Sequence, residues 1–401
     1  MNILFITPRL PYAGIAGGHA IVYQRMMRLA RRGHRVGLAT FASPDDPAEP
    51  DPALSAALAE VVTTPSPLGK HALSRGLRAL TSSAPAYFRA YRSDAMMRAV
   101  GDLAHRGGYD LAIAEFSAMG QYVHRNPYLP AVRKIISSHF GVATAFQSVA
   151  RTMGLTARGL RSRLAVNRLL RYELEMYHGV DRLLVLTAHE RYDMLNADPT
   201  LRINVIPGGV DAAYFHPDDA VPREDALVFT GQYEVEANLD AVLWFASTCW
   251  PILKRRRPGL VLYVVGPGAP EALSALARKD PSIVVTGGVK DVRPYLHRAR
   301  VYVCPVRLGS GLRFKLFEAM AAGTPLVTTS LGAEGIPLQN GDNCFVADKP
   351  DIMAECIDLL LGDEALRASI AGQARAMVKE RFDWEHSIDL LEHVMDNVFL
   401  H

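Results

Sequence analysis

Short apolar runs alternate with helical segments along this chain, and this alternation limits the fold more than any other feature. Residues 2–7 form an apolar run, residues 20–32 have helical periodicity ending at Gly33, and residues 36–41 form the next strand candidate. Further buried-strand candidates lie at 111–115, 134–138 and 182–186. Short apolar strands separated by helices are typical of a parallel sheet that is covered on both faces. The sequence therefore predicts an α/β fold.

The alternation restarts after a segment rich in turn residues. Residues 207–222 contain Pro207, Gly208, Gly209 and Pro222, and strand candidates resume at 226–230, 260–265, 282–286, 301–305 and 326–329, with a helix around 240–257. We expect two Rossmann-like domains facing each other across a cleft, with ligands at the carboxyl ends of the strands. The predicted boundaries are 1–206 for the first domain, 207–222 for a hinge, 223–383 for the second domain, and 384–401 for a last helix that packs back on the first domain. Residues 43–75, rich in Pro, Ala, Ser and Asp, are interpreted as a variable excursion.

Composition narrows the class of protein. A chain of 401 residues favours two domains, and 49% apolar with 21% charged residues is typical of a globular protein. The formal net charge of +3 is too small to indicate a nucleic-acid partner. The four cysteines lack metal-ligand spacing, and no apolar run is long enough to span a bilayer. We expect a cytoplasmic protein with reduced thiols.

A glycine-rich turn followed by a helical run carries the most chemistry. Gly309, Ser310, Gly311 and Leu312 precede two cations, Arg313 and Lys315, and Glu318 follows Lys315 at helical spacing. Glycines let a backbone approach a ligand closely, and the positive end of a helix attracts phosphate oxygens. The carboxylate would repel a phosphate, so we expect it to face hydroxyls such as those of a ribose. The pattern predicts a site for an activated nucleotide.

Several motifs in a fixed order resemble one known family. They are residues 17–18, 32–36, 207–211, 229–231, 264–266, 286–289, 317–327 and 382–384. In these motifs the chain is similar to the retaining GT-B glycosyltransferases, most of all to glycosyltransferase family 4. The resemblance implies transfer of a sugar from a nucleotide-sugar, as co-substrate, to an acceptor hydroxyl with retained anomeric configuration. It also implies a hexosyltransferase-like enzyme that uses neither a metal nor a cofactor, with the donor mainly on the second domain and the acceptor on the first.

The resemblance assigns roles to individual residues. Glu318 matches the family's ribose-binding glutamate, and His139 falls where relatives carry a histidine near the donor sugar. Gly17 and Gly18 match a loop near the diphosphate and the acceptor, and Val289 matches a loop whose backbone holds the nucleobase. The predicted catalytic residues are His139, Arg313 and Lys315, and the predicted donor-binding residues are Glu318, Gly309, Ser310, Gly311, Leu312, Val289, Gly231, Gln232, Gly17 and Gly18.

The chain departs from the family's pattern at two places. Ser310 stands where the family has a first glutamate that contacts the donor sugar, and Gln232 stands after Gly231 where many relatives carry an arginine. Our hypothesis is that Arg313 and Lys315 supply the missing positive charge to the diphosphate. The alternative is that both are surface cations on a helix.

Other interpretations stay open at the level of sequence. His139 is either near the sugar or a histidine that only satisfies its own hydrogen bonds, and Glu190 either lines the acceptor side or, as we favour, charges a helix N-terminus. A basic stretch over 151–171 contacts the inner face of an anionic membrane or is a solvated helix face. The acceptor is a glycan, a lipid-linked sugar or a small molecule in polysaccharide, glycolipid or other glycoconjugate biosynthesis. Two rival functions are a nucleotide-sugar epimerase of the same fold and a nucleotide-sugar-binding scaffold with impaired catalysis.

Overall fold

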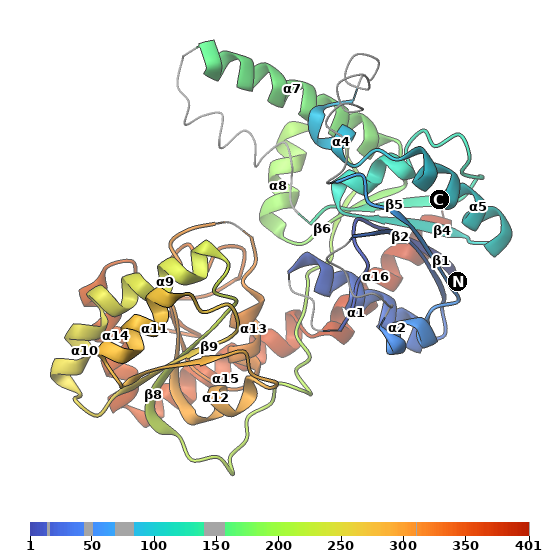
Figure 1. Ribbon diagram of the computed structural model, residues 1–401. Helices are drawn as coiled ribbons and strands as arrows, with labels where there is room; N and C mark the ends of the chain where they lie inside the picture. Colours follow the sequence, from blue (N-terminus) through green and yellow to red (C-terminus); the bar gives the residue numbers. More distant parts are fainter. Residues whose placement is uncertain (14–16, 44–50, 69–83, 140–156, 310, 401) are drawn as a thin grey trace. The chain divides into compact units, whose positions relative to one another are not determined.

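The structure is a computed structural model that describes residues 1–13, 17–43, 51–68, 84–139, 157–309 and 311–400, with only the backbone for 157–163. Its contacts divide the chain into two units, Met1–Pro207 with Ile388–His401, and Gly208–Ser387. Each unit is built on its own parallel sheet, with helices between the strands (Figure 1). The predicted α/β class is confirmed.

Unit 1 contains a seven-stranded sheet in the order β3-β2-β1-β4-β5-β6-β7, and every described pair is parallel. Its strands are β1 (Asn2–Thr7), β2 (Arg35–Ala42), β3 (Glu60–Pro65), β4 (Leu111–Glu115), β5 (Arg133–Ser137), β6 (Arg182–Val185) and β7 (Ile203–Val205). The central strands are buried on both faces, which explains why they are continuous apolar runs. The order reverses between β1 and β4, so unit 1 has a topological switch point there.

Helices cover both faces of this sheet. They are α1 (Gly18–Arg31), α2 (Pro52–Ala57), α4 (Ala86–Ala90), α5 (Asp94–Gly107), the 3-10 helix η1 (Ser117–Tyr122), α7 (Ala157–His178), α8 (Ala188–Ala197) and α16 (Trp384–Phe399). Alternate residues of β1 point to opposite faces: Phe5 packs with α1, α2 and α16, whereas Ile6 packs with α5 and η1. Figure 1 shows α1, α2 and α16 close together along one side of the sheet.

The interpretation of residues 43–75 as an excursion is wrong for its described part. Residues 51–68 contain α2 and β3, and β3 is the edge strand that pairs with β2 from Gly37↔Glu60 onward. The run Val61–Thr64 has high β propensity, and an edge strand needs only one neighbour. The surrounding Pro and Ala hid this short signal.

Unit 2 contains a six-stranded parallel sheet in the order β10-β9-β8-β11-β12-β13. Its strands are β8 (Glu224–Thr230), β9 (Val261–Val265), β10 (Ile283–Gly287), β11 (Ala299–Cys304), β12 (Leu326–Thr328) and β13 (Phe345–Val346). Its helices are α9 (Glu236–Thr248), α10 (Trp250–Arg256), α11 (Glu271–Lys279), α12 (Arg293–Arg298), α13 (Phe314–Ala321), α14 (Pro350–Gly362) and α15 (Glu364–Arg381). The order reverses between β8 and β11, the second switch point.

The single helix expected around 240–257 is two helices, α9 and α10, which meet at Cys249. Pro251 occupies the first turn of α10, where the missing N–H of proline costs nothing, but inside one long helix it would remove a hydrogen bond. Helical periodicity alone did not reveal this break.

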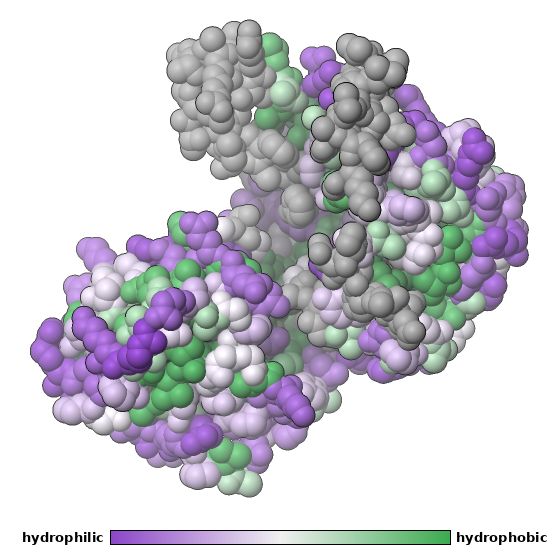
Figure 2. All heavy atoms as spheres, in the orientation of Figure 1, coloured by the Kyte–Doolittle hydropathy of each residue, from purple (hydrophilic) through white to green (hydrophobic). Residues whose placement is uncertain are grey.

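The hydropathy of the surface and the cysteines of the described residues indicate no functional site by themselves. In the view of Figure 2, hydrophilic and hydrophobic residues are interspersed over the described parts of each unit. All four cysteines are free. Over the described ranges, none of the helices combines the length and apolarity that a bilayer span requires. Nor does any group of three or more His, Cys, Asp or Glu side chains in those ranges have an arrangement that could hold a metal.

Candidate functional site

The switch point of unit 2 brings together two of the segments that the sequence singled out. Thr230 ends β8 and is followed by Gly231 and Gln232, while β11 leads into residues 305–313 and then α13. Since β8 and β11 are parallel neighbours, both segments leave the same edge of the sheet. Open α/β sheets bind ligands at this place, outside the carboxyl ends of the strands.

The backbone before α13 takes a shape that favours glycine. Gly309 and Gly311 have φ of 85° and 90°, in the region that side chains disfavour. Ser310 lies between them, outside the described residues. Within the described part of the chain, no side chain caps the start of α13 and its first turn holds no acidic residue. Its first N–H groups and its positive end are therefore suited to an anion.

Lys315 is built into the switch point. Its Nζ donates hydrogen bonds to Asn238 Oδ1 at 2.6 Å and to the Thr230 carbonyl at 3.2 Å, and it lies 4.1 Å from the centre of the Phe229 ring. Burial lowers the pKa of Lys315 to about 8, although the side chain is still largely charged at pH 7. Lys315 is thus half-buried, which argues against the alternative of a solvated surface cation. Arg313, also half-buried, donates from Nη1 to the Gly311 carbonyl at 2.6 Å.

Glu318 lies one helical turn beyond Lys315 and is also half-buried. Among the described residues its carboxylate has no hydrogen-bonding partner and no ion pair within 4 Å. Burial raises the pKa of Glu318 to about 7, and the charge of Lys315 opposes that rise only in part. Removing a carboxylate from water without giving it a hydrogen-bond donor costs free energy. This group is therefore ready to accept hydrogen bonds from the hydroxyls of a ligand.

The remaining predicted donor residues lie along the same edge of the sheet. The Gln232 carbonyl accepts from Asn238 Nδ2 at 2.8 Å, which ties this turn to the amide that also contacts Lys315, while the Gln232 side chain is exposed. A side chain on Gly266 would come within 1.8 Å of the Gly231 carbonyl, so the loops after β8 and β9 approach closely. Half-buried Leu312 packs against the core of unit 2, and Val289 follows β10, which β9 separates from β8.

Asn238 was missed by the sequence reasoning. It lies in the first turn of α9 and its amide joins Gln232 to Lys315, 77 positions along the chain from Asn238. A polar residue at the start of a helix next to a glycine turn was the available signal, but helix starts are commonly polar for other reasons. Its partner, Lys315, lies too far along the chain to be inferred from the local sequence.

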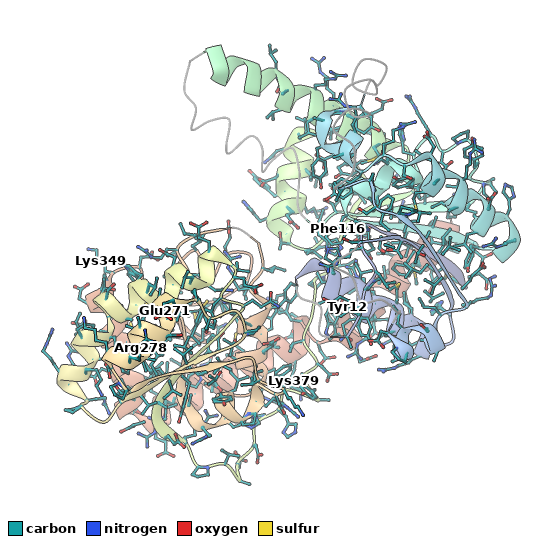
Figure 3. All side chains as sticks on the ribbon, viewed as in Figure 1. Tyr12, Phe116, Glu271, Arg278, Lys349 and Lys379 are labelled. Carbon is teal, nitrogen blue, oxygen red and sulfur yellow. The ribbon has the colours of Figure 1, made fainter. Side chains whose placement is uncertain are left out.

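The unit 1 residues gather at the other switch point. The His139 imidazole stacks on Phe116 (labelled in Figure 3) with ring centres 4.0 Å apart, and its Nε2 lies 2.7 Å from Glu115 Oε2. Arg25 donates to Glu115 Oε1 at 3.1 Å. Burial raises the pKa of Glu115, but Arg25 and His139 outweigh it and hold that pKa at about 2. This buried pair of Arg25 and Glu115 was not predicted.

The same contacts define the tautomer of His139. Burial lowers the pKa of His139, so the ring is neutral at pH 7 and Nε2 carries the proton donated to Glu115. Nδ1 is then an acceptor; it is buried and unpartnered within the described residues. It faces Gly18, where an added Cβ would lie 2.6 Å away, while Gly17 has a φ of 66°. The structure thus places Gly18 directly beside the His139 imidazole.

Gly18→Ala tests whether this arrangement matters. The new methyl group would collide with His139 Nδ1 and lie 2.9 Å from the Phe116 ring, so the imidazole must shift. If His139 acts in catalysis, we expect turnover to fall by about tenfold or more, since small displacements of catalytic groups are costly. Gly259→Ala is the control, because Gly259 is exposed on unit 2 and a Cβ added there would meet nothing within 4 Å. Equal turnover in both variants would contradict a catalytic role for His139.

The structure tests the interpretation of Glu190 fully and describes only part of the basic stretch. Glu190 forms a capping box with Thr187, accepting from the Thr187 N–H at 3.1 Å, so the favoured helix N-terminus interpretation is confirmed. In the basic stretch, Arg168 and Arg171 are exposed on α7 while Leu169 is buried. The side chains of residues 151–163 lie outside the described residues.

Comparisons with known proteins identify the class. The model of Glycosyltransferase Family 4 matches residues 15–214, and the model of Glycosyl transferases group 1 matches residues 224–363. Together they span most of both units. The chain belongs to this family of GT-B glycosyltransferases, and the predicted resemblance is confirmed.

Curated relatives support the same family. The chain is 28% identical over 240 residues to the D-inositol 3-phosphate glycosyltransferase of Rhodococcus jostii, covering 53% of this chain and 52% of the relative. It is 34% identical over 224 residues to the phosphatidyl-myo-inositol mannosyltransferase of Mycolicibacterium smegmatis, covering 53% and 56%. These matches span about half the length of the curated relatives. The D-inositol 3-phosphate glycosyltransferase of Segniliparus rotundus matches at 27% identity over 94% of this chain and 84% of its own.

Solved structures share the fold. The sucrose-phosphate synthase of Thermosynechococcus elongatus superposes with a TM-score of 0.71 at 16% identity, covering 100% of both chains. WaaG, a glycosyltransferase involved in lipopolysaccharide biosynthesis, gives 0.62 at 18% identity, covering 97% of this chain and 99% of its own. HepE of Anabaena in complex with UDP gives 0.68 at 14% identity, covering 99% and 100%.

Proposed function

We propose that this chain is a retaining glycosyltransferase that moves a sugar from a nucleotide-sugar to an acceptor hydroxyl in glycoconjugate biosynthesis. One observation carries the proposal: a half-buried cation, Lys315, and a half-buried carboxylate without a described partner, Glu318, lie one turn apart on α13 at the switch point of unit 2. The ammonium of Lys315 suits the negative charge of a diphosphate, and the carboxylate of Glu318 suits the hydroxyls of a ribose. Family membership supports the same reaction class.

The proposed chemistry is a dissociative transfer. Negative charge grows on the diphosphate as it leaves, and Lys315, Arg313 and the first N–H groups of α13 stabilise it. These protein charges stabilise the leaving diphosphate, so the proposed mechanism needs no metal. The acceptor hydroxyl arrives on the face that the diphosphate leaves, and a phosphate oxygen takes its proton. His139 stays the predicted catalytic residue of unit 1, where its neutral imidazole can accept a hydrogen bond at Nδ1.

The identities of donor and acceptor follow from relatives only as proposals. The Anabaena HepE structure holds UDP, and the curated relatives are named for inositol phosphates and phosphatidyl-inositol. We therefore propose a nucleoside diphosphate sugar as donor and a polyol or glycan hydroxyl as acceptor. Contact with an anionic membrane stays a prediction, supported by the exposed Arg168 and Arg171 on α7.

The rates should depend on pH through the two α13 side chains. Below about pH 7 Glu318 becomes protonated and accepts hydrogen bonds from hydroxyls less well. Above about pH 8 Lys315 loses its charge. Because kcat/KM reports groups of the free enzyme, its profile for the donor should be a narrow bell with its maximum between these values. Initial rates at low donor concentration measure it. Glu318→Gln should remove the acid limb, and a flat profile from roughly pH 6 to 9 would contradict the assignment of both groups.

A thermal screen of nucleotide-sugars tests the proposed function. A donor at about 100 times its Kd should stabilise the fold by about 2.7 kcal/mol, which raises the melting temperature measurably. The stabilising donor is then incubated with an acceptor panel, and NMR of the product reads the anomeric configuration. Retained configuration supports the proposal and inversion contradicts the retaining mechanism. An epimer formed from donor alone, or binding without turnover, would instead favour an epimerase or a scaffold.

A further inference from the structure

A pocket lies on unit 2, at the amino ends of its strands. It has a volume of about 560 Å³ and lies between the segment before β8, the start of β11, the turn after α13 and one face of α15. Its lining includes Arg223, Arg300, Arg367 and Arg375. The donor residues described above follow the carboxyl ends of the same strands, so the pocket and the candidate donor site lie at opposite edges of one sheet.

Three of the four arginines are fixed by main-chain oxygens and have no carboxylate within ion-pairing distance among the described residues. Arg223 donates to the Ala299 and Gly323 carbonyls at 2.6 and 2.9 Å. Arg367 donates to the Leu360 carbonyl at 2.7 Å, and Arg375 to the Ala321 carbonyl at 3.0 Å. Carbonyl oxygens hold a guanidinium in place but leave its full charge uncompensated. These side chains are therefore preorganised cations.

The remaining charges do not cancel this excess. Arg300 forms an ion pair with Asp225, and the three acidic residues of the lining, Asp218, Asp219 and Glu364, are exposed, whereas the arginines are half-buried. The positive groups thus form the inner wall and the negative groups lie at the rim. Burial first, and then repulsion from a neighbouring arginine, lower the pKa of Arg223 and Arg367, and nearby carboxylates oppose that fall only in part.

The shape of α15 leaves room for such a counter-ion. Ala368, Ala371 and Gly372 lie on its pocket face between Arg367 and Arg375. A Cβ added at Gly372 would meet nothing within 4 Å. Glycine inside a helix is less favourable than alanine by about 1 kcal/mol, so this glycine is not explained by the stability of α15. Small residues here keep the space in front of the guanidinium groups open.

We propose that this pocket binds a small polyanion carrying phosphate or carboxylate groups, at a site separate from the donor site. Guanidinium groups match the two oxygens of a phosphate or a carboxylate with paired hydrogen bonds. A ligand with two or more anionic groups can engage Arg367 and Arg375 at the same time. Because the arginines are already held by carbonyls, little side-chain ordering opposes binding.

Calorimetric titration with inorganic pyrophosphate and with citrate, at constant ionic strength, tests the site on the whole chain. The main variant is Gly372→Leu, which fills the pocket without changing charge and, as a better helix former, should not lower stability. The second is the double variant Arg367→Gln/Arg375→Gln. The control is Arg278→Gln, because Arg278 pairs with Glu271 on the exposed face of α11 (both labelled in Figure 3). Lys315→Ala, which weakens the proposed donor site, separates binding there from binding in the pocket.

We expect at least one of the two probes to bind the wild-type chain, and its affinity to fall about tenfold or more in Gly372→Leu and in the double variant. The affinity should be unchanged in Arg278→Gln and retained in Lys315→Ala. Preference for pyrophosphate or for citrate identifies the anionic group. Binding that is lost only in Lys315→Ala, or no binding of either probe, would overturn the proposal while leaving the proposed glycosyl transfer untouched.

Discussion

Replacing Lys315 by alanine should lower kcat/KM for the nucleotide-sugar by about 100-fold to 1000-fold, the range seen when one preorganised donor to a developing negative charge is removed. The ammonium is held by Asn238 and the Thr230 carbonyl, so its position does not have to be organised when the diphosphate leaves. Initial rates over a range of donor concentrations measure the loss. Lys379→Ala is the matched control, since Lys379 (labelled in Figure 3) is an exposed lysine of the same unit.

The lysine has a structural role as well, and a second variant separates the two. Asn238→Ala removes the amide that contacts Lys315 but keeps the charge, so we expect a smaller loss than in Lys315→Ala. If both variants and the Lys379 control lose the same activity, the effect is not specific to a charge on the diphosphate. Wild-type kcat/KM in Lys315→Ala would end the hypothesis that this residue replaces the family's missing cation.

Glu318→Gln should have opposite effects on binding and on stability. The folded-state pKa of Glu318 is about 7 against an ordinary value of 4.5, so the native state binds the proton more tightly than the unfolded state does. Stability contributed by the protonated form is therefore lost as pH rises from about 4.5 to 7, and the loss is about 3 kcal/mol at pH 8. The amide carries no charge, so the variant should be more stable than wild type at pH 8 and closer to it at pH 5. Urea denaturation at both pH values measures this.

The same variant should bind the nucleotide less well. An amide accepts hydrogen bonds at only one of its two ends, so we expect the Kd of the donor to rise about tenfold or more. Glu234→Gln is the control, because Glu234 is exposed in the turn before α9. A variant that is less stable than wild type at pH 8, or that binds the donor as tightly, would contradict the role given to Glu318.

The sequence predicted the sheets well because buried parallel strands are local apolar runs. The strand predicted at 111–115 coincides with β4. The first strand predicted after the turn-rich segment, at 226–230, lies within β8. It failed where the signal was short or had two interpretations. The edge strand β3 lay hidden among Pro and Ala, and the periodicity over 240–257 concealed the break at Pro251.

The candidate site divides in the same way. Lys315 and Glu318 were found because helical spacing is visible in a local stretch of sequence. Asn238, Glu115 and Arg25 were not found, because their partners lie far along the chain: Arg25 and Glu115 are 90 positions apart. Such contacts depend on how strands and helices are ordered in the sheet, which local patterns do not specify. The hydrogen-bond partner of His139, Glu115, could therefore be identified only from the structure.

A crystal structure of the chain soaked with its stabilising nucleotide-sugar tests the central claim most directly. We predict density for the diphosphate at the first turn of α13 within hydrogen-bonding distance of Lys315, with the ribose hydroxyls on Glu318. A nucleotide bound elsewhere on the chain, with the start of α13 open to solvent, would contradict the account.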